Sequence, residues 1–142
     1  MHTIKQVNEI TGISKAALRF YDDEKIICAK RQENDYRVYD KIDILHLKYL
    51  SLLKYAGFTL PEIKALINAL NAEYSEECHE RCTNIISTGI LKLQKTVDSY
   101  NKILNLLSQA IPLIENFDDG EEKKLEMDNF IEKLYKDIIK GE

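Results

Sequence analysis

Residues Ile4–Tyr39 read "IKQVNEITGISKAALRFYDDEKIICAKRQENDYRVY" and decide the fold. They predict two short helices joined by a tight turn at Gly12, with Thr3 and Ser14 at the two helix starts. Hydroxyl side chains suit these positions because they accept hydrogen bonds from the free N–H groups of a first helical turn. Apolar residues follow each cap at helical spacing. Two helices about a glycine turn form a helix-turn-helix, whose second helix can lie in the major groove of DNA.

The segment after the second helix is predicted to be a β-hairpin, or wing. Helical periodicity is lost over residues 25–40, and strand-favouring residues flank the turn pair Asn34-Asp35. The segment also contains three cations that can reach a phosphate backbone: Lys30, Arg31 and Arg37.

Two more helices are predicted beyond the wing. Asp40 caps a helix that ends at Gly57, since glycine is the usual residue after a helix C-terminus. Thr59 caps the next helix, with Glu62 completing a capping box and a proline in the first turn. Residues 1–72 are therefore expected to form one winged helix-turn-helix domain.

A long helix is predicted over residues 75–114, after the polar stretch 71–77. Its apolar positions alternate steps of three and four residues, which is typical of a coiled-coil seam. The seam consists of His79, Cys82, Ile86, Ile90, Leu93, Val97, Tyr100, Leu104, Leu107, Ile111 and Ile114. Such a seam needs a partner helix, and the same helix of a second copy is the simplest one. Pro112 is expected to end or kink the helix near residues 110–111.

Residues 115–142 are expected to hold a charged connector and a last amphipathic helix. One apolar stripe follows that helix: Met127, Phe130, Ile131, Leu134, Tyr135 and Ile138. The stripe either packs against the long helix or the head, or it lines or covers an effector pocket.

The composition is that of a folded protein, with 44% hydrophobic and 31% charged residues in a chain of 142. No apolar run can span a membrane, and the N-terminus lacks the apolar core of a signal peptide, so a cytoplasmic location is expected. The net charge of −4 divides into +2 over residues 1–70 and −6 over residues 71–142. A basic head on an acidic tail suits a DNA-binding module with an appended segment for assembly or sensing.

Three blocks of the sequence resemble the MerR (mercury-resistance regulator) family in their order and spacing. They are "GISKAALRFYD" at residues 12–22, "NDYRVY" at 34–39 and "LKYAGFTLPEI" at 53–63. The resemblance covers residues 3–70. It implies a mostly α-helical fold with a winged helix-turn-helix head, a long antiparallel coiled-coil dimerisation helix and a short C-terminal effector segment.

The same resemblance implies a function. A homodimer would bind double-stranded promoter DNA at a pseudo-palindromic operator between promoter elements that are set too far apart. An effector, which the sequence leaves open as a small molecule, a redox signal or a metal, would make the dimer untwist the DNA so that RNA polymerase can engage. Such distortion costs free energy that contacts with the DNA backbone must offset.

Roles in the recognition helix are also implied by the resemblance. Lys15 and Ala16 should approach base edges, whereas Arg19 and Tyr21 match positions that clamp phosphates in the family. Ser14 combines the helix cap with a phosphate contact. Tyr21 has packing as its alternative role.

Roles in the wing follow in the same way. Arg31, Tyr36 and Arg37 match the wing, and Lys54 matches a second, helical wing. For Arg37, as for the arginine of the recognition helix, DNA contact is preferred because a cation in these blocks has little use in packing. Tyr36 has packing as an alternative, and packing is favoured for Tyr39.

Four positions depart from the family pattern, and one of them is Phe20, which stands where the family often has a second tyrosine and so loses one hydroxyl contact. Asp35 stands where the family usually has glycine in the wing turn, at a position where a positive φ is expected. Lys25 replaces a frequent glycine at the end of the second helix, and Ala29 replaces a frequent proline. The other three departures concern the geometry of the wing rather than its chemistry.

A possible effector or thiol site lies at the start of the long helix, in the sequence "CHERC". Cys78 and Cys82 are one helical turn apart on one face, and His79 lies on the seam. A helix N-terminus lowers the pKa of a thiol, so metal binding or oxidation is chemically possible. The alternative is that these residues merely begin the seam. No Cys or His follows over residues 112–124, where the family's metal sensors carry further thiols, so no metal site is assigned.

Two other functions remain open on the residues alone. A coiled-coil protein with this head can be a DNA-architectural or protein-docking module, which salt-sensitive but sequence-indifferent DNA binding would reveal. A thiol- or metal-binding protein using Cys78 and Cys82 is the second. No arrangement of nucleophile, base and orienting group suggests an enzyme, and no cofactor is expected.

Overall fold

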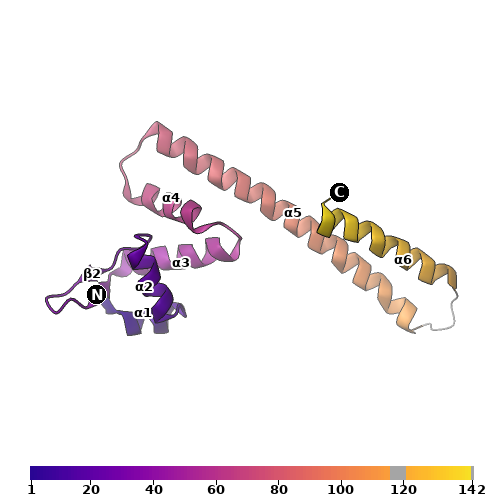
Figure 1. Ribbon diagram of the computed structural model, residues 1–142, viewed down its shortest axis with the longest axis horizontal. Helices are drawn as coiled ribbons and strands as arrows, with labels where there is room; N and C mark the ends of the chain where they lie inside the picture. The colour runs from indigo at the N-terminus through magenta and orange to yellow at the C-terminus, as the bar shows by residue number, and fades with distance from the viewer. Residues whose placement is uncertain (116–120, 142) are drawn as a thin grey trace. The chain divides into compact units, whose positions relative to one another are not determined.

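The computed structural model describes residues 1–115 and 121–141, which form mostly α-helices with one small sheet (Figure 1). The chain divides into two compact units, Met1–Gly89 and Ile90–Glu142. The first unit holds the head together with the start of the long helix. Within the described ranges, no helix is long and apolar enough to cross a membrane.

The helix-turn-helix is built from α1 (Ile4–Thr11) and α2 (Lys15–Asp23). Thr3 and Ser14 cap these helices as predicted, because each hydroxyl accepts a hydrogen bond from the backbone N–H three residues later. Gly12 takes the left-handed conformation between them, with φ +74°. The predicted helix-turn-helix is confirmed.

The wing is an antiparallel sheet with the strand order β1-β3-β2. Its strands are β1 (His2–Thr3), β2 (Lys30–Arg31) and β3 (Arg37–Tyr39). Asp35 between β2 and β3 has φ +62°, and Lys25 after α2 has φ +54°. Both residues that stand in place of a glycine therefore adopt the left-handed backbone. The predicted hairpin is confirmed, and β1 joins it as a third strand that the sequence did not predict.

The third helix, α3 (Lys41–Tyr55), starts at Asp40, whose Oδ1 accepts hydrogen bonds from two backbone N–H groups of the first turn. Asp40 Oδ2 lies 2.5 Å from Lys30 Nζ. The bond to Lys30 and the backbone bonds lower the pKa of Asp40 to about 2. One ionised carboxylate thus fastens the start of α3 to the wing.

The fourth helix, α4 (Leu60–Asn71), is capped by Thr59, which accepts a bond from the Glu62 N–H at 3.4 Å. The bonds described at this cap do not include the reciprocal side-chain bond expected from Glu62. Apolar residues of α1–α4, the wing and the segment after α2 meet in one core: Val7, Leu18, Tyr21, Ile26, Ile27, Tyr39, Ile44, Leu47, Leu50, Ile63 and Ile67. This core fixes α2 and the wing relative to each other.

The long helix is α5 (Glu76–Glu115), which continues through Pro112. Of the two outcomes expected of Pro112, an end of the helix near residues 110–111 is therefore wrong, and a kink there stays a prediction. The missing N–H of proline affects a single hydrogen bond in the last turns, where few helical bonds remain to be lost. At the other end, Ser75 Oγ accepts a hydrogen bond from the Cys78 N–H at 3.1 Å and caps the helix.

The first turns of α5 pack against the head. A Cβ atom on Gly89 would lie 2.2 Å from Cζ and 2.6 Å from Cε1 of Phe58, so the phenyl ring rests directly on the helix backbone there. Cys82 Sγ lies 4.0 Å from the carbonyl oxygen of Ala65 in α4. The head and the start of α5 therefore form one packed body.

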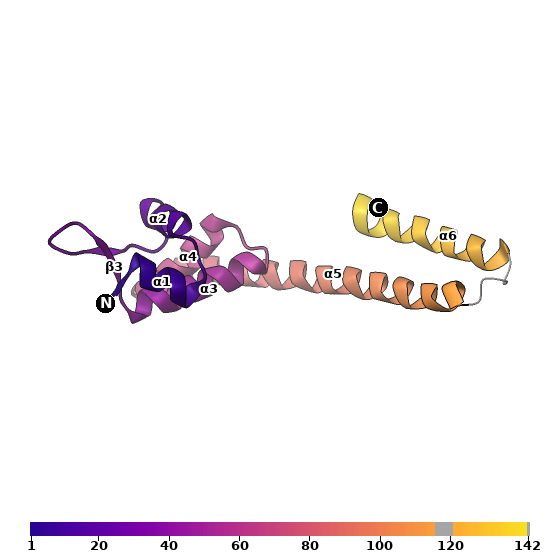
Figure 2. The ribbon, with the colours of Figure 1, turned by 90° about the horizontal axis from the view of Figure 1, so that it is seen from below.

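In the second unit, α6 (Glu121–Tyr135) runs back along the C-terminal part of α5 and continues into a π-helical turn, Lys136–Lys140 (Figure 2). The least exposed residues of this helical segment lie on one face: Met127, Phe130, Leu134 and Ile138. On α5, the half-buried residues in this part are Ser99, Ile103, Leu106 and Ala110, which adjoin the seam rather than belong to it. Part of the predicted connector, residues 116–120, lies outside the described residues.

Candidate nucleic-acid interface

The recognition helix α2 presents three of its predicted DNA contacts to solvent. Lys15, Ala16 and Arg19 are exposed, and neither cation forms an ion pair within the described residues. Ser14 uses its hydroxyl as the helix cap, which places the residue where unpaired N–H groups and the positive end of the helix dipole favour an anion. This face can therefore approach both phosphates and base edges.

Tyr21 differs from these residues because it belongs to the core. Only 5% of it is exposed, and its ring meets the Phe20 ring edge-on with a centroid distance of 5.8 Å. Packing, the alternative role of Tyr21, thus accounts for most of its surface. A phosphate contact through its hydroxyl remains a prediction. Tyr39 is 1% exposed, in keeping with the packing role expected for it.

The wing arginines are held by carboxylates of α2. Arg37 Nε lies 2.6 Å from Asp22 Oδ2, and Arg37 Nη2 lies 2.9 Å from Asp23 Oδ1. The bond to Asp22 raises the pKa of Arg37 and so favours its charged form further. Arg31 Nη2 lies 3.2 Å from the same Asp22 oxygen. The argument that a cation at position 37 has little use in packing does not hold, and its DNA contact remains a prediction.

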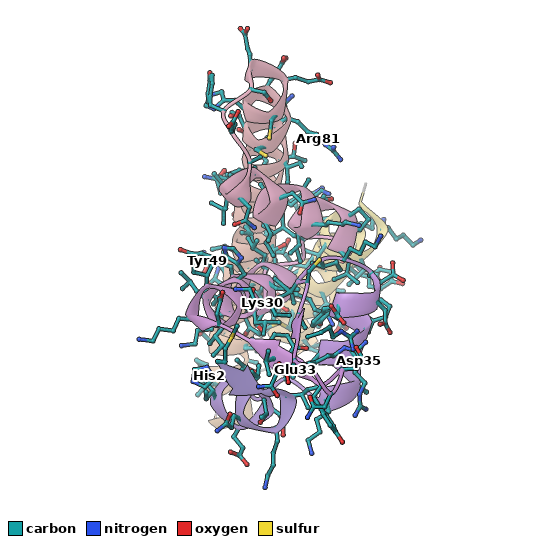
Figure 3. All side chains as sticks on the ribbon, turned by 90° about the vertical axis from the view of Figure 1, so that its left-hand side faces the viewer. His2, Lys30, Glu33, Asp35, Tyr49 and Arg81 are labelled. Carbon is teal, nitrogen blue, oxygen red and sulfur yellow. The ribbon has the colours of Figure 1, made fainter. Side chains whose placement is uncertain are left out.

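The rest of the wing is open to solvent. Tyr36 is 69% exposed, and the loop between β2 and β3 also carries Glu33 and Asp35 (Figure 3). Arg31 donates a hydrogen bond to the Asp35 carbonyl oxygen at 3.2 Å, which ties the loop to β2. Lys54 is exposed in the last turn of α3. Tyr36 and Lys54 are therefore accessible to a DNA backbone, as their predicted roles require.

The cysteine pair lies in the first turns of α5, next to α4. A cavity of about 290 Å³ opens there, lined in part by Ala65, Ala69, Cys78 and Cys82. Burial raises the pKa of the Cys82 thiol, and its interaction with the neighbouring Cys78 sulfur adds to this effect. The expected lowering of a thiol pKa by the helix start therefore does not apply to Cys82, because it lies a full turn inside the helix against α4.

His79 does not join the two thiols in a larger ligand set. It is exposed, and its ring lies near Tyr74 with a centroid distance of 5.8 Å. Among the residues that the structure describes, no three His, Cys, Asp or Glu side chains are grouped to hold a metal ion. Besides the two sulfurs, the cavity is lined by polar side chains that include Asn68, Glu77 and Arg81.

Two tertiary contacts of the first unit were not predicted from the sequence. The first is Asp22 as the shared partner of both wing arginines, which the run of acids at the end of the recognition helix could have suggested. The second is the contact of Phe58 with Gly89, which joins residues 31 positions apart and leaves no local signal. Charge runs can be read from a sequence, but long-range packing cannot.

Comparisons with known proteins place this geometry among regulators. The family described as MerR HTH family regulatory protein matches residues 2–70. An uncharacterised HTH-type transcriptional regulator of Synechocystis sp. is 30% identical over 118 residues, which cover 78% of this chain and 85% of the relative.

The solved structures similar to this chain include proteins that are also described as regulators. HiNmlR, described as a MerR family regulator that lacks the sensor domain and is bound to promoter DNA, is 27% identical. The match has a TM-score of 0.56 and covers 79% of this chain and 94% of HiNmlR. A MerR family regulator from Listeria monocytogenes has the same fold, with a TM-score of 0.68 at 18% identity, covering 94% of this chain and 98% of the other.

Proposed function

The chain belongs to the MerR family of helix-turn-helix transcriptional regulators, and we propose that it binds promoter DNA as a homodimer and distorts it in response to an effector. The exposed face of α2 beside the wing carries Lys15, Ala16 and Arg19, and neither cation pairs with an acid among the residues that the structure describes; this observation supports the proposal most directly. A helix of this kind enters the major groove while flanking cations meet phosphates. HiNmlR, which shares the fold, was solved on promoter DNA.

Dimerisation is supported by the state of the α5 seam. Its apolar residues are largely exposed on a single chain, for example Val97 at 56%, Leu104 at 60% and Leu107 at 58%. The α6 helix covers the face of α5 next to the seam and leaves the seam itself uncovered, so the seam stays open along the second unit. A row of this length is too apolar to remain in water, and the same row of a second copy would cover it. Two heads would then be held at a fixed spacing for two half-sites.

The action on the promoter extends this proposal. Two heads at fixed spacing can bend or untwist the DNA between their half-sites if contacts with the backbone offset the deformation energy. RNA polymerase would then engage promoter elements that are poorly aligned in relaxed DNA. The test is transcription in vitro from a promoter whose spacer is shortened stepwise, which should remove the need for the regulator.

Arg19→Ala should weaken binding to all DNA sequences alike. Removal of one phosphate contact is expected to lower the slope of log K against log salt by about 1. Fluorescence anisotropy with operator and unrelated duplexes at several salt concentrations measures both quantities. The control is Arg81, an exposed arginine on α5 (Figure 3). Arg81→Ala removes the same charge outside the interface and should leave the slope unchanged. An unaltered slope for Arg19→Ala would contradict its role at the phosphates.

As the site that responds to the effector, we propose the pair of thiols Cys78 and Cys82. The two sulfurs interact with each other beside one cavity, so they can share a soft metal ion or be oxidised to a disulfide, losing two protons and two electrons to an oxidant. The cavity is lined on its α4 side by small side chains, which leave room next to the sulfurs.

The pair of thiols is tested by Cys78→Ser/Cys82→Ser, with Cys28→Ser as the matched control because Cys28 is exposed near the wing. The double variant should bind operator DNA normally but lose its transcriptional response to soft metal ions and to diamide. The control should keep both. If the double variant still responds, the effector acts elsewhere.

A further inference from the structure

The carboxylate of Asp22 lies at the end of the recognition helix and meets three groups from the wing side. Asp22 Oδ1 accepts a hydrogen bond from the backbone N–H of Ala29 at 2.9 Å, just before β2 begins. Asp22 Oδ2 accepts from Arg31 Nη2 at 3.2 Å and from Arg37 Nε at 2.6 Å, one arginine on each strand of the hairpin. Its side chain is only 10% exposed. The neighbouring Asp23 is 66% exposed, and Arg37 is its one side-chain partner among residues 1–115 and 121–141.

The base of the wing is held by β1, by Tyr39 in the core and by the Lys30–Asp40 ion pair, and Asp22 adds an anchor on the side of α2. The strands of the wing are two or three residues long, and an isolated hairpin of this size is at best marginally stable in water. Charge-assisted hydrogen bonds to a largely buried carboxylate are among the stronger polar contacts available. Asp22 combines two of them with a backbone bond, so that it fixes both strands to α2.

We propose that Asp22 is a positioning residue for DNA binding, which orders the wing arginines against α2 before DNA arrives. The inference rests on the proposed DNA-binding role of the wing. A guanidinium has five N–H donors, and those of Arg37 and Arg31 that do not point at carboxylates remain able to donate to phosphates. Arg31, 42% exposed, is the better placed of the two. Ordering these long side chains in advance removes a cost that DNA binding would otherwise bear.

The sign of the effect separates this role from simple electrostatics. Asp22 is a negative charge beside a surface that meets a polyanion, and charges within about 10 Å still interact at ordinary ionic strength. If charge alone mattered, Asp22→Asn would tighten DNA binding. If Asp22 positions the wing, the same substitution weakens binding although it removes a repulsive charge.

The test compares Asp22→Asn with Asp23→Asn in the full chain, by anisotropy with a promoter duplex at several salt concentrations. Asp22→Asn is expected to weaken binding about tenfold, because the side chains of Arg31 and Arg37 would then be ordered only when DNA binds. It should also make the salt dependence shallower, because fewer phosphates are contacted. Asp23→Asn carries the same charge change but removes only one contact, the exposed one with Arg37, so it should weaken binding far less than Asp22→Asn does.

Further measurements exclude a mere loss of folding. A partly unfolded variant would bind more weakly with an unchanged salt slope, and that result would overturn the proposal, as would tighter binding by Asp22→Asn. Asp22→Glu should restore most of the affinity. Without DNA, amide hydrogen exchange at Gln32, whose N–H donates to the Tyr36 carbonyl oxygen at 3.1 Å, should quicken in Asp22→Asn and not in Asp23→Asn.

The hydrogen-exchange measurement also separates the two proposals. If the wild type failed to bind promoter DNA, the proposed function would fall. Faster exchange of the wing in Asp22→Asn alone would still establish that Asp22 orders the wing. Equal exchange in both variants would overturn the ordering itself.

Discussion

Leu104→Glu is expected to yield folded single chains that no longer pair and that bind the operator at least about a hundredfold more weakly, since linked binding of two sites commonly gains a factor of about 10²–10⁴. Leu104 lies on the α5 seam and is 60% exposed on a single chain, so its replacement removes little packing within the protomer. Glutamate also favours helix. In a dimer, however, the carboxylate would be buried at an apolar seam without a partner, which is strongly unfavourable.

Asn105→Glu is the matched control, because it places the same charge on the same turn of α5 outside the seam. Sedimentation or light scattering measures the mass, circular dichroism the helix content, and anisotropy the operator affinity. The control should remain a dimer with normal affinity. Leu104→Glu that still forms a dimer would show that another surface pairs the two chains.

Gly89→Val should destabilise the protein by about 2–3 kcal/mol, the upper part of the usual range for overpacking. The Cβ atom alone would meet the Phe58 ring at 2.2 Å, and two methyl groups extend the conflict. The ring must leave its place on α5, which loosens the start of that helix from the head. Operator affinity should fall as well, because the two heads would no longer be held at one spacing.

Thr88→Val is the control, because it places a valine at the neighbouring exposed position of α5 and should leave the stability nearly unchanged. Urea unfolding at one fixed protein concentration gives the free energies, because the stability of a dimer depends on concentration. Phe58→Ala should be costly by itself but should relieve much of the Gly89→Val penalty in the double variant. Strictly additive effects of the two substitutions would contradict the contact.

Much of the head could be predicted from its own residues. Thr3, Ser14 and Asp40 cap helices, and each does so through bonds to N–H groups two or three residues away. Gly12 and Asp35 occupy turns that need a positive φ, a property of a single residue and its neighbours. These signals are local, so the sequence carried them without knowledge of the rest of the fold.

The DNA-facing residues could be predicted only in part. Arg19 is exposed and has no ion pair in the described part of the chain, as its assigned role requires, whereas Arg37 is 20% exposed and bonded to two carboxylates. Both are arginines in recognisable blocks, and nothing in their spacing separates them. What differs is which acidic side chains the folded chain brings near them.

By itself, the sequence determined the helix-turn-helix, the wing and the apolar seam of the long helix, because caps, turns and heptad spacing act over a few residues. Only the tertiary structure decided that Asp22 joins the wing to α2, that Phe58 rests on Gly89 and that Cys82 faces α4. The contacts Asp22–Arg37, Phe58–Gly89 and Cys82–Ala65 each join residues 15 or more positions apart. They depend on how the core packs the helices together, and no local pattern records that packing.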